Sequence, residues 1–178
     1  MFIKYTEHSL LDGAIKIKDL CKKTTELGMT AMSITDHGSM SGVIEFYKEC
    51  QKFKIKPLIG IEAYITEDPD NLPKEQRTRD NYHMILIAIN NIGYKNLLWL
   101  ISNANRSNFY YKPRIYEKHL AARSEGIVAT SGCLAGKVCR TLTGTTLQLK
   151  DLPTKDCYIE GRRLIERYAE IFKDRFYL

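Results

Sequence analysis

Polar side chains that can bind a metal ion stand near the ends of several short apolar segments. Asp36 and His37 lie at the end of AMSITDHG, Glu62 lies in KPLIGIEAY, His83 opens YHMILIAI, and Cys133 closes GIVATSGC. In α/β proteins, ligands and metals gather at the carboxyl ends of strands, where loops leave the sheet. Carboxylate, imidazole and thiolate groups all serve as zinc ligands. The arrangement therefore predicts a multinuclear metal site of hydrolase type, to which each strand contributes about one side chain.

The segments that carry these residues alternate with amphipathic helical patterns. We predict strands at 1–5, 31–35, 56–64, 83–89, 126–130 and 175–178. We predict helices at 14–27, 43–53, 94–104, 115–122, 135–142 and 160–172. The charged run 66–81 is expected to be an exposed loop. Alternation of this kind indicates the α/β class, with a mostly parallel sheet that is either open or closed into a barrel.

Composition narrows the class of protein further. A chain of 178 residues with 44% hydrophobic content suits one globular domain. Five cysteines without CxxC spacing favour the reducing cytoplasm over a disulfide framework, and we assign Cys21, Cys50, Cys139 and Cys157 to packing. No apolar run approaches the roughly 20 residues of a membrane span, and the start lacks a signal-peptide pattern, so no membrane partner is expected. The net charge of +6 is compatible with DNA as a partner.

Several motifs resemble one family. TEHSLLDGAIKI, TDHG, GIEAY, YKPRI and SGCLAG, in this order, closely resemble the polymerase and histidinol phosphatase (PHP) domain of the bacterial DNA polymerase III alpha subunit. The resemblance covers almost the whole chain, apart from about 67–80 and 143–160. It implies a distorted seven-stranded (βα) barrel, here incomplete with about six strands. Residues 1–178 would be a single PHP domain that is truncated before its last metal-ligand motif and contains no polymerase palm or fingers.

The resemblance also implies which residues belong to the metal site. Up to three divalent ions (Zn, Mn or Fe) would be held by the positions that match here Asp12, His37, Glu62, His83 and Cys133. The two histidines of the first family motif fall on Ile3 and Tyr5, which cannot ligate as imidazole does. The final Asp-x-His motif lies past Leu178. We therefore expect partial or absent metal occupancy, and phosphoesterase or exonuclease activity that is weak or lost.

Each of these residues also has a purely structural interpretation. His37 could cap the next helix with Asp36 as its partner, Glu62 could form a salt bridge, and Cys133 could be a small core residue. His83 at the start of a strand could be a structural histidine. Lys112 and Arg114 could contact a phosphate backbone or a neighbouring polymerase domain, or lie in a solvated loop.

Three functional readings follow. The first is the structural PHP part of a replicative DNA polymerase III alpha-like protein, located in the cytoplasm and joined to the remaining polymerase segments. Such a chain cannot polymerise DNA alone, because the palm carboxylates that hold the catalytic metals lie elsewhere in the family. The second is a free-standing metal-dependent phosphoesterase or 3′–5′ exonuclease in which His8 substitutes for the lost histidines. The third is a non-enzymatic protein that docks onto polymerase parts.

Overall fold

The computed structural model describes residues 5–10, 12–67, 73–146 and 153–178. The helices are α1 (Ile17–Glu26), α2 (Val43–Phe53), α3 (Asn91–Arg106), α4 (Glu117–Ala122), α5 (Lys137–Leu142) and α6 (Thr154–Phe172), with 3-10 turns η1 (Lys74–Gln76) and η3 (Lys173–Arg175). The strands are β1 (Ala31–Ile34), β2 (Lys56–Thr66), β3 (Tyr82–Ala88), β4 (Phe109–Tyr110), β5 (Lys112–Tyr116), β6 (Ile127–Thr130) and β7 (Phe176–Tyr177).

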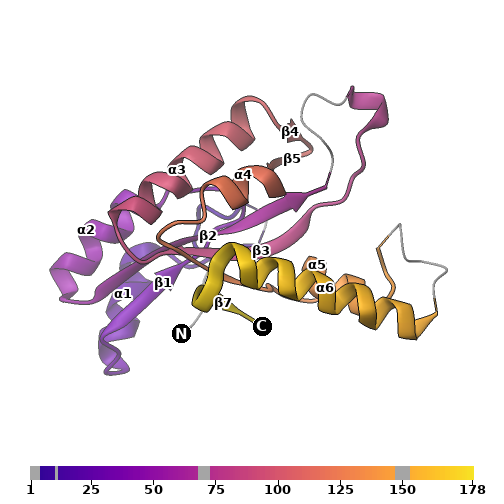
Figure 1. The fold of residues 1–178 in the computed structure, drawn as a ribbon. Helices are drawn as coiled ribbons and strands as arrows, with labels where there is room; N and C mark the ends of the chain where they lie inside the picture. The colour runs from indigo at the N-terminus through magenta and orange to yellow at the C-terminus, as the bar shows by residue number, and fades with distance from the viewer. Residues whose placement is uncertain (1–4, 11, 68–72, 147–152) are drawn as a thin grey trace.

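A mixed, seven-stranded sheet forms the centre of the molecule (Figure 1). Its order is β4-β5-β2-β3-β6-β7, with β1 paired to the first half of β2. No pairing joins β1 to β7 in the described ranges, so the sheet stays open, as expected of an incomplete barrel. The prediction of a mostly parallel sheet is wrong, because β3 runs antiparallel to both β2 and β6. The described residues of the connection from β2 to β3 contain the 3-10 turn η1 and no crossover helix, which a parallel pair requires.

The two faces of the sheet carry different sets of side chains. Ile61 and Ala63 of β2 pair with Leu86 and Met84 of β3 on the face that the helices cover. The alternate positions, including Glu62, point to the opposite face, because side chains alternate along a strand. The helix-covered face therefore supplies the main core, and the other face carries Glu62 and His83 beside the buried Tyr64, Ile85 and Ile87.

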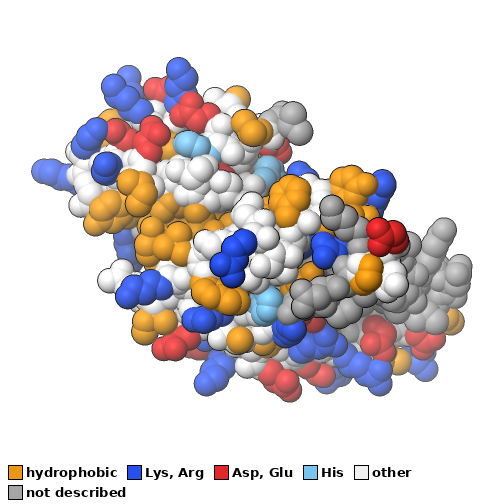
Figure 2. Space-filling model, turned by 90° about the horizontal axis from the view of Figure 1, so that it is seen from above, with side chains coloured by type: hydrophobic (Ala, Val, Ile, Leu, Met, Phe, Trp, Pro, Cys, Tyr) orange, Lys and Arg blue, Asp and Glu red, His pale blue; other side chains and the backbone are white. Residues whose placement is uncertain are grey.

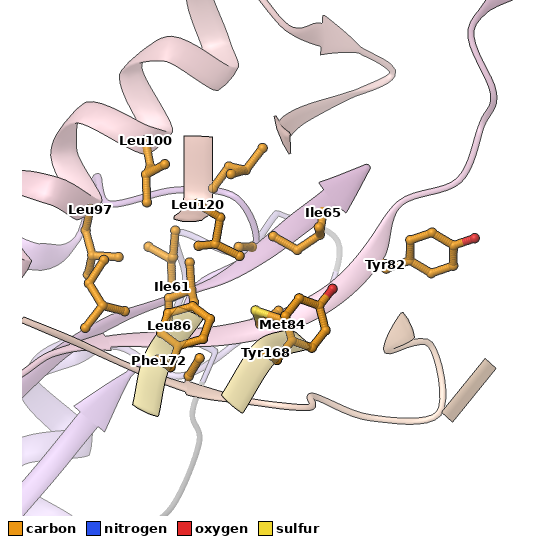
Figure 3. Close-up of a cluster of buried hydrophobic side chains, with 14 of the residues drawn as sticks. Ile61, Ile65, Tyr82, Met84, Leu86, Leu97, Leu100, Leu120, Tyr168 and Phe172 are labelled. Atoms are coloured by element: carbon orange, nitrogen blue, oxygen red, sulfur yellow. The ribbon is translucent and has the colours of Figure 1, made fainter. Parts of the chain in front are cut away.

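The main core lies between this face and the helices. Figure 3 shows side chains of α3, α4 and α6 meeting those of β2 and β3, among them Leu97, Leu100, Leu120, Tyr168, Phe172, Ile61 and Leu86. A second core joins α1 and α2 to β1 and contains the buried Cys21 and Cys50. All five cysteines are free thiols, and Cys157 is also buried. No helix in the described ranges is long and apolar enough to cross a bilayer.

The structure confirms most of the predicted elements and adds some. The strands predicted at 31–35, 56–64, 83–89, 126–130 and 175–178 correspond to β1, β2, β3, β6 and β7. The strand predicted at 1–5 falls almost wholly outside the described residues. Strands β4 and β5 were not predicted, because the YYKPRI segment contains a proline and two charged residues, which are rare inside strands. Pro113 is tolerated there, as it lies near the start of β5 and close to the sheet edge.

Candidate functional site

The antiparallel direction of β3 decides where the site residues meet. His37 follows β1 and pairs with Glu62 of β2 through an isolated parallel bridge. His83, near the start of β3, lies opposite Tyr64, two residues beyond Glu62 on the same face of the sheet. The end of β6 meets β3 at the same edge, which brings the loop with Cys133 nearby. The predicted residues therefore converge, although His83 comes from the start of its strand and not from its end.

The Glu62 carboxylate is the centre of this cluster. It is 2% exposed. Its Oε1 lies 2.7 Å from Nδ1 of His37 and 3.1 Å from Nδ1 of His83. Its Oε2 accepts a hydrogen bond from the hydroxyl of Tyr5. A buried carboxylate is costly unless it is paired and hydrogen-bonded, and here side chains of the same chain meet that need.

His37 is held between two carboxylates and one aromatic ring. Its Nε2 lies 2.7 Å from Oδ2 of Asp12, while its Nδ1 faces Glu62. The Tyr5 ring stacks on the His37 imidazole, with ring centroids 4.1 Å apart and an interplanar angle of 21°. Gly38, at φ +56°, completes the turn, and a Cβ there would lie 2.9 Å from the Tyr64 ring. The TDHG motif is therefore needed for the turn as well as for the imidazole.

His83 and Cys133 form the outer part of the cluster. The Cys133 Sγ lies 3.6 Å from Nδ1 of His83, and the Tyr64 ring packs edge-on against His83 at a centroid distance of 5.4 Å. Burial lowers the pKa of His83, against the opposing effect of the Glu62 carboxylate. Gly132 has φ +85°, and a Cβ there would lie 2.6 Å from the carbonyl oxygen of His83. The SGCL motif thus requires glycine to bring Cys133 this close to β3.

Asp36 serves the fold and not the site, although the sequence singled it out together with His37. Its carboxylate accepts hydrogen bonds from the Thr6 amide at 2.6 Å, the Thr6 hydroxyl at 2.8 Å and the Ser9 hydroxyl at 2.6 Å. The Ser9 hydroxyl in turn accepts from the His37 amide. Asp36 is 2% exposed and fastens the first described segment to the end of β1.

The contacts of His8 lie at the start of α2 and not at Glu62. Its Nδ1 lies 3.2 Å from the Ser41 hydroxyl and its Nε2 lies 3.9 Å from the Glu45 carboxylate, both near the start of α2. Neither contact involves the Glu62 cluster. The residue that donates to Oε2 of Glu62 is Tyr5, which was not among the predicted site residues. The signal was present, because Tyr5 falls on a histidine position of the family motif.

Arg114 and Lys112 have opposite environments. Arg114 is fully buried, its Nη1 donates to the carbonyl of Thr78 at 3.0 Å, and its guanidinium lies 5.0 Å from the Tyr110 ring centroid. A side chain with no solvent-exposed surface cannot contact DNA or another domain, so the predicted contact does not hold for Arg114. Lys112 is exposed, with its ammonium 5.2 Å from the Tyr64 ring centroid.

The donor set has the elements that zinc accepts, but its arrangement does not fit a metal ion. In the described part of the chain, no three His, Cys, Asp or Glu side chains are placed so that they could share one ion. Both ring nitrogens of His37 face carboxylate oxygens, and both oxygens of Glu62 accept hydrogen bonds. These donors pair with one another, and we call this pairing the closed state of the Glu62 cluster.

A cleft of about 700 Å³ opens beside the cluster. Its lining includes His37, Tyr64 and, from the β4–β5 hairpin, Phe109, Tyr111 and Lys112. The cleft is large enough for a nucleotide-sized ligand.

Comparisons with known proteins agree with the motifs. The family model described as "PHP domain" matches residues 5–178. The DNA polymerase III subunit alpha of Helicobacter pylori (strain J99) is 48% identical over 98% of this chain and 14% of that protein. The subunit of the same name from Borreliella burgdorferi is 38% identical over 98% of this chain and 14% of that protein. The chain therefore spans 14% of the length of these relatives.

One solved structure, from Bifidobacterium adolescentis, is described as a proposed metal-dependent phosphoesterase. It is 19% identical and covers 57% of this chain and 32% of its own chain, with a TM-score of 0.41.

Proposed function

Since this chain belongs to the PHP domain family, we propose that it is the PHP part of a replicative DNA polymerase III alpha-like protein and serves there as a structural domain. Its partners would be the remaining segments of that polymerase, which its relatives contain in addition to the matched region. Five free cysteines suit the reducing cytoplasm, where we place it.

The observation that carries this proposal is the closed state of the Glu62 cluster. Hydrolysis of a phosphoester at a multinuclear site needs a metal-bound hydroxide and a second ion beside the leaving oxygen. In this chain the donor atoms are occupied by Tyr5, His37, His83 and Asp12 contacts. The arrangement favours a scaffold over a phosphoesterase.

A hydrolysis assay tests the proposal. The chain, incubated with bis-p-nitrophenyl phosphate or with a labelled single-stranded oligonucleotide and Mn²⁺ or Zn²⁺, should release no product above the buffer blank. Glu62→Ala provides the matched control, because a contaminating nuclease is indifferent to this change. A rate that the substitution abolishes would establish the chain as an enzyme.

Co-expression tests the partner. The remaining part of a relative's alpha subunit should co-elute with this chain in gel filtration. Separate elution of two folded species would count against a polymerase scaffold.

A second candidate function is contact with single-stranded nucleic acid at the β4–β5 hairpin. Tyr111 and Phe109 are 61% and 53% exposed, and Tyr111 has φ +59°, a conformation that is rare for a bulky residue. The Arg79 guanidinium lies 4.7 Å from the Tyr111 ring centroid and donates to its hydroxyl. Aromatic rings beside basic groups are typical of surfaces on which bases stack. On the face shown in Figure 2, hydrophobic side chains lie next to lysine and arginine side chains.

Lys112→Ala should weaken binding of a labelled oligothymidylate about threefold and reduce the salt slope of log K by about 0.7, because one phosphate contact is lost. Fluorescence anisotropy at several salt concentrations measures both quantities. Lys22→Ala, an exposed change on α1, should alter neither. Equal effects of the two substitutions would show that only net charge matters and would remove the hairpin from consideration.

A further inference from the structure

The negative charge of the buried Glu62 carboxylate must be compensated by neighbouring side chains. Glu62 is 2% exposed and sits in the middle of β2, so solvent cannot supply the compensation. The Nδ1 atoms of His37 and His83 both contact Oε1 of Glu62. That leaves Oε2, which has a separate partner.

Tyr5 is that partner, and it is placed by two contacts. Its hydroxyl donates to Oε2 of Glu62, and its ring lies flat on the His37 imidazole. A phenol carries its proton at neutral pH, so the Tyr5 hydroxyl is a hydrogen-bond donor to this carboxylate. Thr6, the next residue, is fastened to Asp36 through both its amide and its hydroxyl, which fixes the backbone from which Tyr5 projects.

We propose that Tyr5 acts as a built-in substitute for a metal ion, whose phenol closes the Glu62 cluster and makes its stability independent of divalent metals. The inference rests on the structural function proposed above and explains how such a domain stays folded without an ion. A tyrosine at this position supplies one hydrogen-bond donor to the carboxylate, whereas an ion would require several converging ligands. A metal ion bound to Oε2 of Glu62 would have to displace the Tyr5 hydroxyl that now donates to this atom.

Thermal unfolding of the chain with EDTA, ZnCl₂ or MnCl₂ tests whether Tyr5 takes the place of a metal ion. The unchanged chain should unfold at the same Tm, within about 1 °C, in all three conditions. Tyr5→Phe should lower the Tm by about 5 °C, because Oε2 loses its donor inside the fold. Tyr5→His should bind one zinc ion per chain by titration calorimetry and gain about 5 °C or more when zinc exceeds its Kd about 100-fold.

Two control variants isolate the effect. Tyr168→Phe removes another phenol-to-glutamate hydrogen bond, to Glu117, and should lower the Tm without creating a zinc response. Tyr47→His introduces a histidine at an exposed position of α2 and should also leave the Tm insensitive to zinc.

Three outcomes would overturn the role of Tyr5. They are stoichiometric zinc binding with a raised Tm in the unchanged chain, an unaltered Tm in Tyr5→Phe, and a folded Tyr5→His that ignores zinc. If Tyr5→His does not fold, the unchanged chain and Tyr5→Phe decide. If the unchanged chain binds zinc but does not hydrolyse the substrate, the proposal that Tyr5 replaces a metal ion is wrong, while the proposed structural function still stands. If the Tm of the unchanged chain does not depend on zinc and the chain does not associate with polymerase segments, the proposed function is wrong, while the role of Tyr5 still stands.

Discussion

Glu117→Leu should lower the free energy of unfolding by about 3 kcal/mol, because it leaves a buried lysine with less compensation. Lys137 is 6% exposed, and its ammonium lies 2.5 Å from Glu117 Oε1 and 2.6 Å from Glu67 Oε1. Glu117 also accepts from Arg167 at 3.0 Å and from the Tyr168 hydroxyl at 2.9 Å. This one carboxylate therefore connects α4, α5 and α6.

Urea denaturation at pH 7 measures the loss. The matched control is Glu166→Leu, which removes an exposed pair with Arg162 on α6 and should change stability by less than about 0.5 kcal/mol. Replacing Lys137 by Met in the Glu117→Leu background should restore part of the lost stability, since the uncompensated charge disappears with it. Similar losses for Glu117→Leu and Glu166→Leu would show that the buried network contributes nothing special.

The same network predicts a pH dependence. Burial on its own raises the pKa of Glu117, but Lys137, Tyr168 and Arg167 outweigh it, and the net pKa lies below the ordinary value of 4.5. A carboxyl whose pKa is lowered by folding contributes stability above its unfolded pKa and loses it as the pH falls through the folded value. The stability difference between the unchanged chain and Glu117→Leu should therefore be constant from pH 7 to about pH 5 and shrink below that.

Asp36→Ala should cost about 3 kcal/mol and release the first described segment from the sheet. The substitution removes the acceptor for the Thr6 amide, the Thr6 hydroxyl and the Ser9 hydroxyl at a 2% exposed position. Since Thr6 positions its neighbour Tyr5, the phenol should leave Glu62 as well. Chemical denaturation gives the free energy, and hydrogen exchange of the Thr6 and Glu7 amides reports the release.

Asp19→Ala is the control for Asp36→Ala. Asp19 is an exposed residue in the first turn of α1, where its charge favours the helix by about 0.3–1 kcal/mol. Protected Thr6 and Glu7 amides in Asp36→Ala would contradict the anchoring role, whatever the loss of stability.

Local patterns were sufficient for much of the fold. The amphipathic repeat around Phe46 and Cys50 predicted α2, and the apolar run after His83 predicted β3, because these elements bury residues at spacings that the chain itself displays. Strand β5 was not predicted because Arg114 looks like a surface residue. Its partners Thr66 and Thr78, among others, make its burial tolerable. Such partners lie far along the chain and leave no periodic signal.

The sequence by itself determined the family and the candidate residues. His37, Glu62, His83 and Cys133 each sit in a short motif, and the local backbone requires Gly38 after His37 and Gly132 before Cys133. The tertiary structure alone decided what those residues do. Tyr5 and Glu62 are 57 positions apart, and their hydrogen bond depends on the antiparallel β2–β3 pair and on the anchoring of Thr6 to Asp36. Whether a carboxylate meets a metal or a phenol is set by which atoms the fold brings within hydrogen-bonding distance, and no spacing along the chain encodes that.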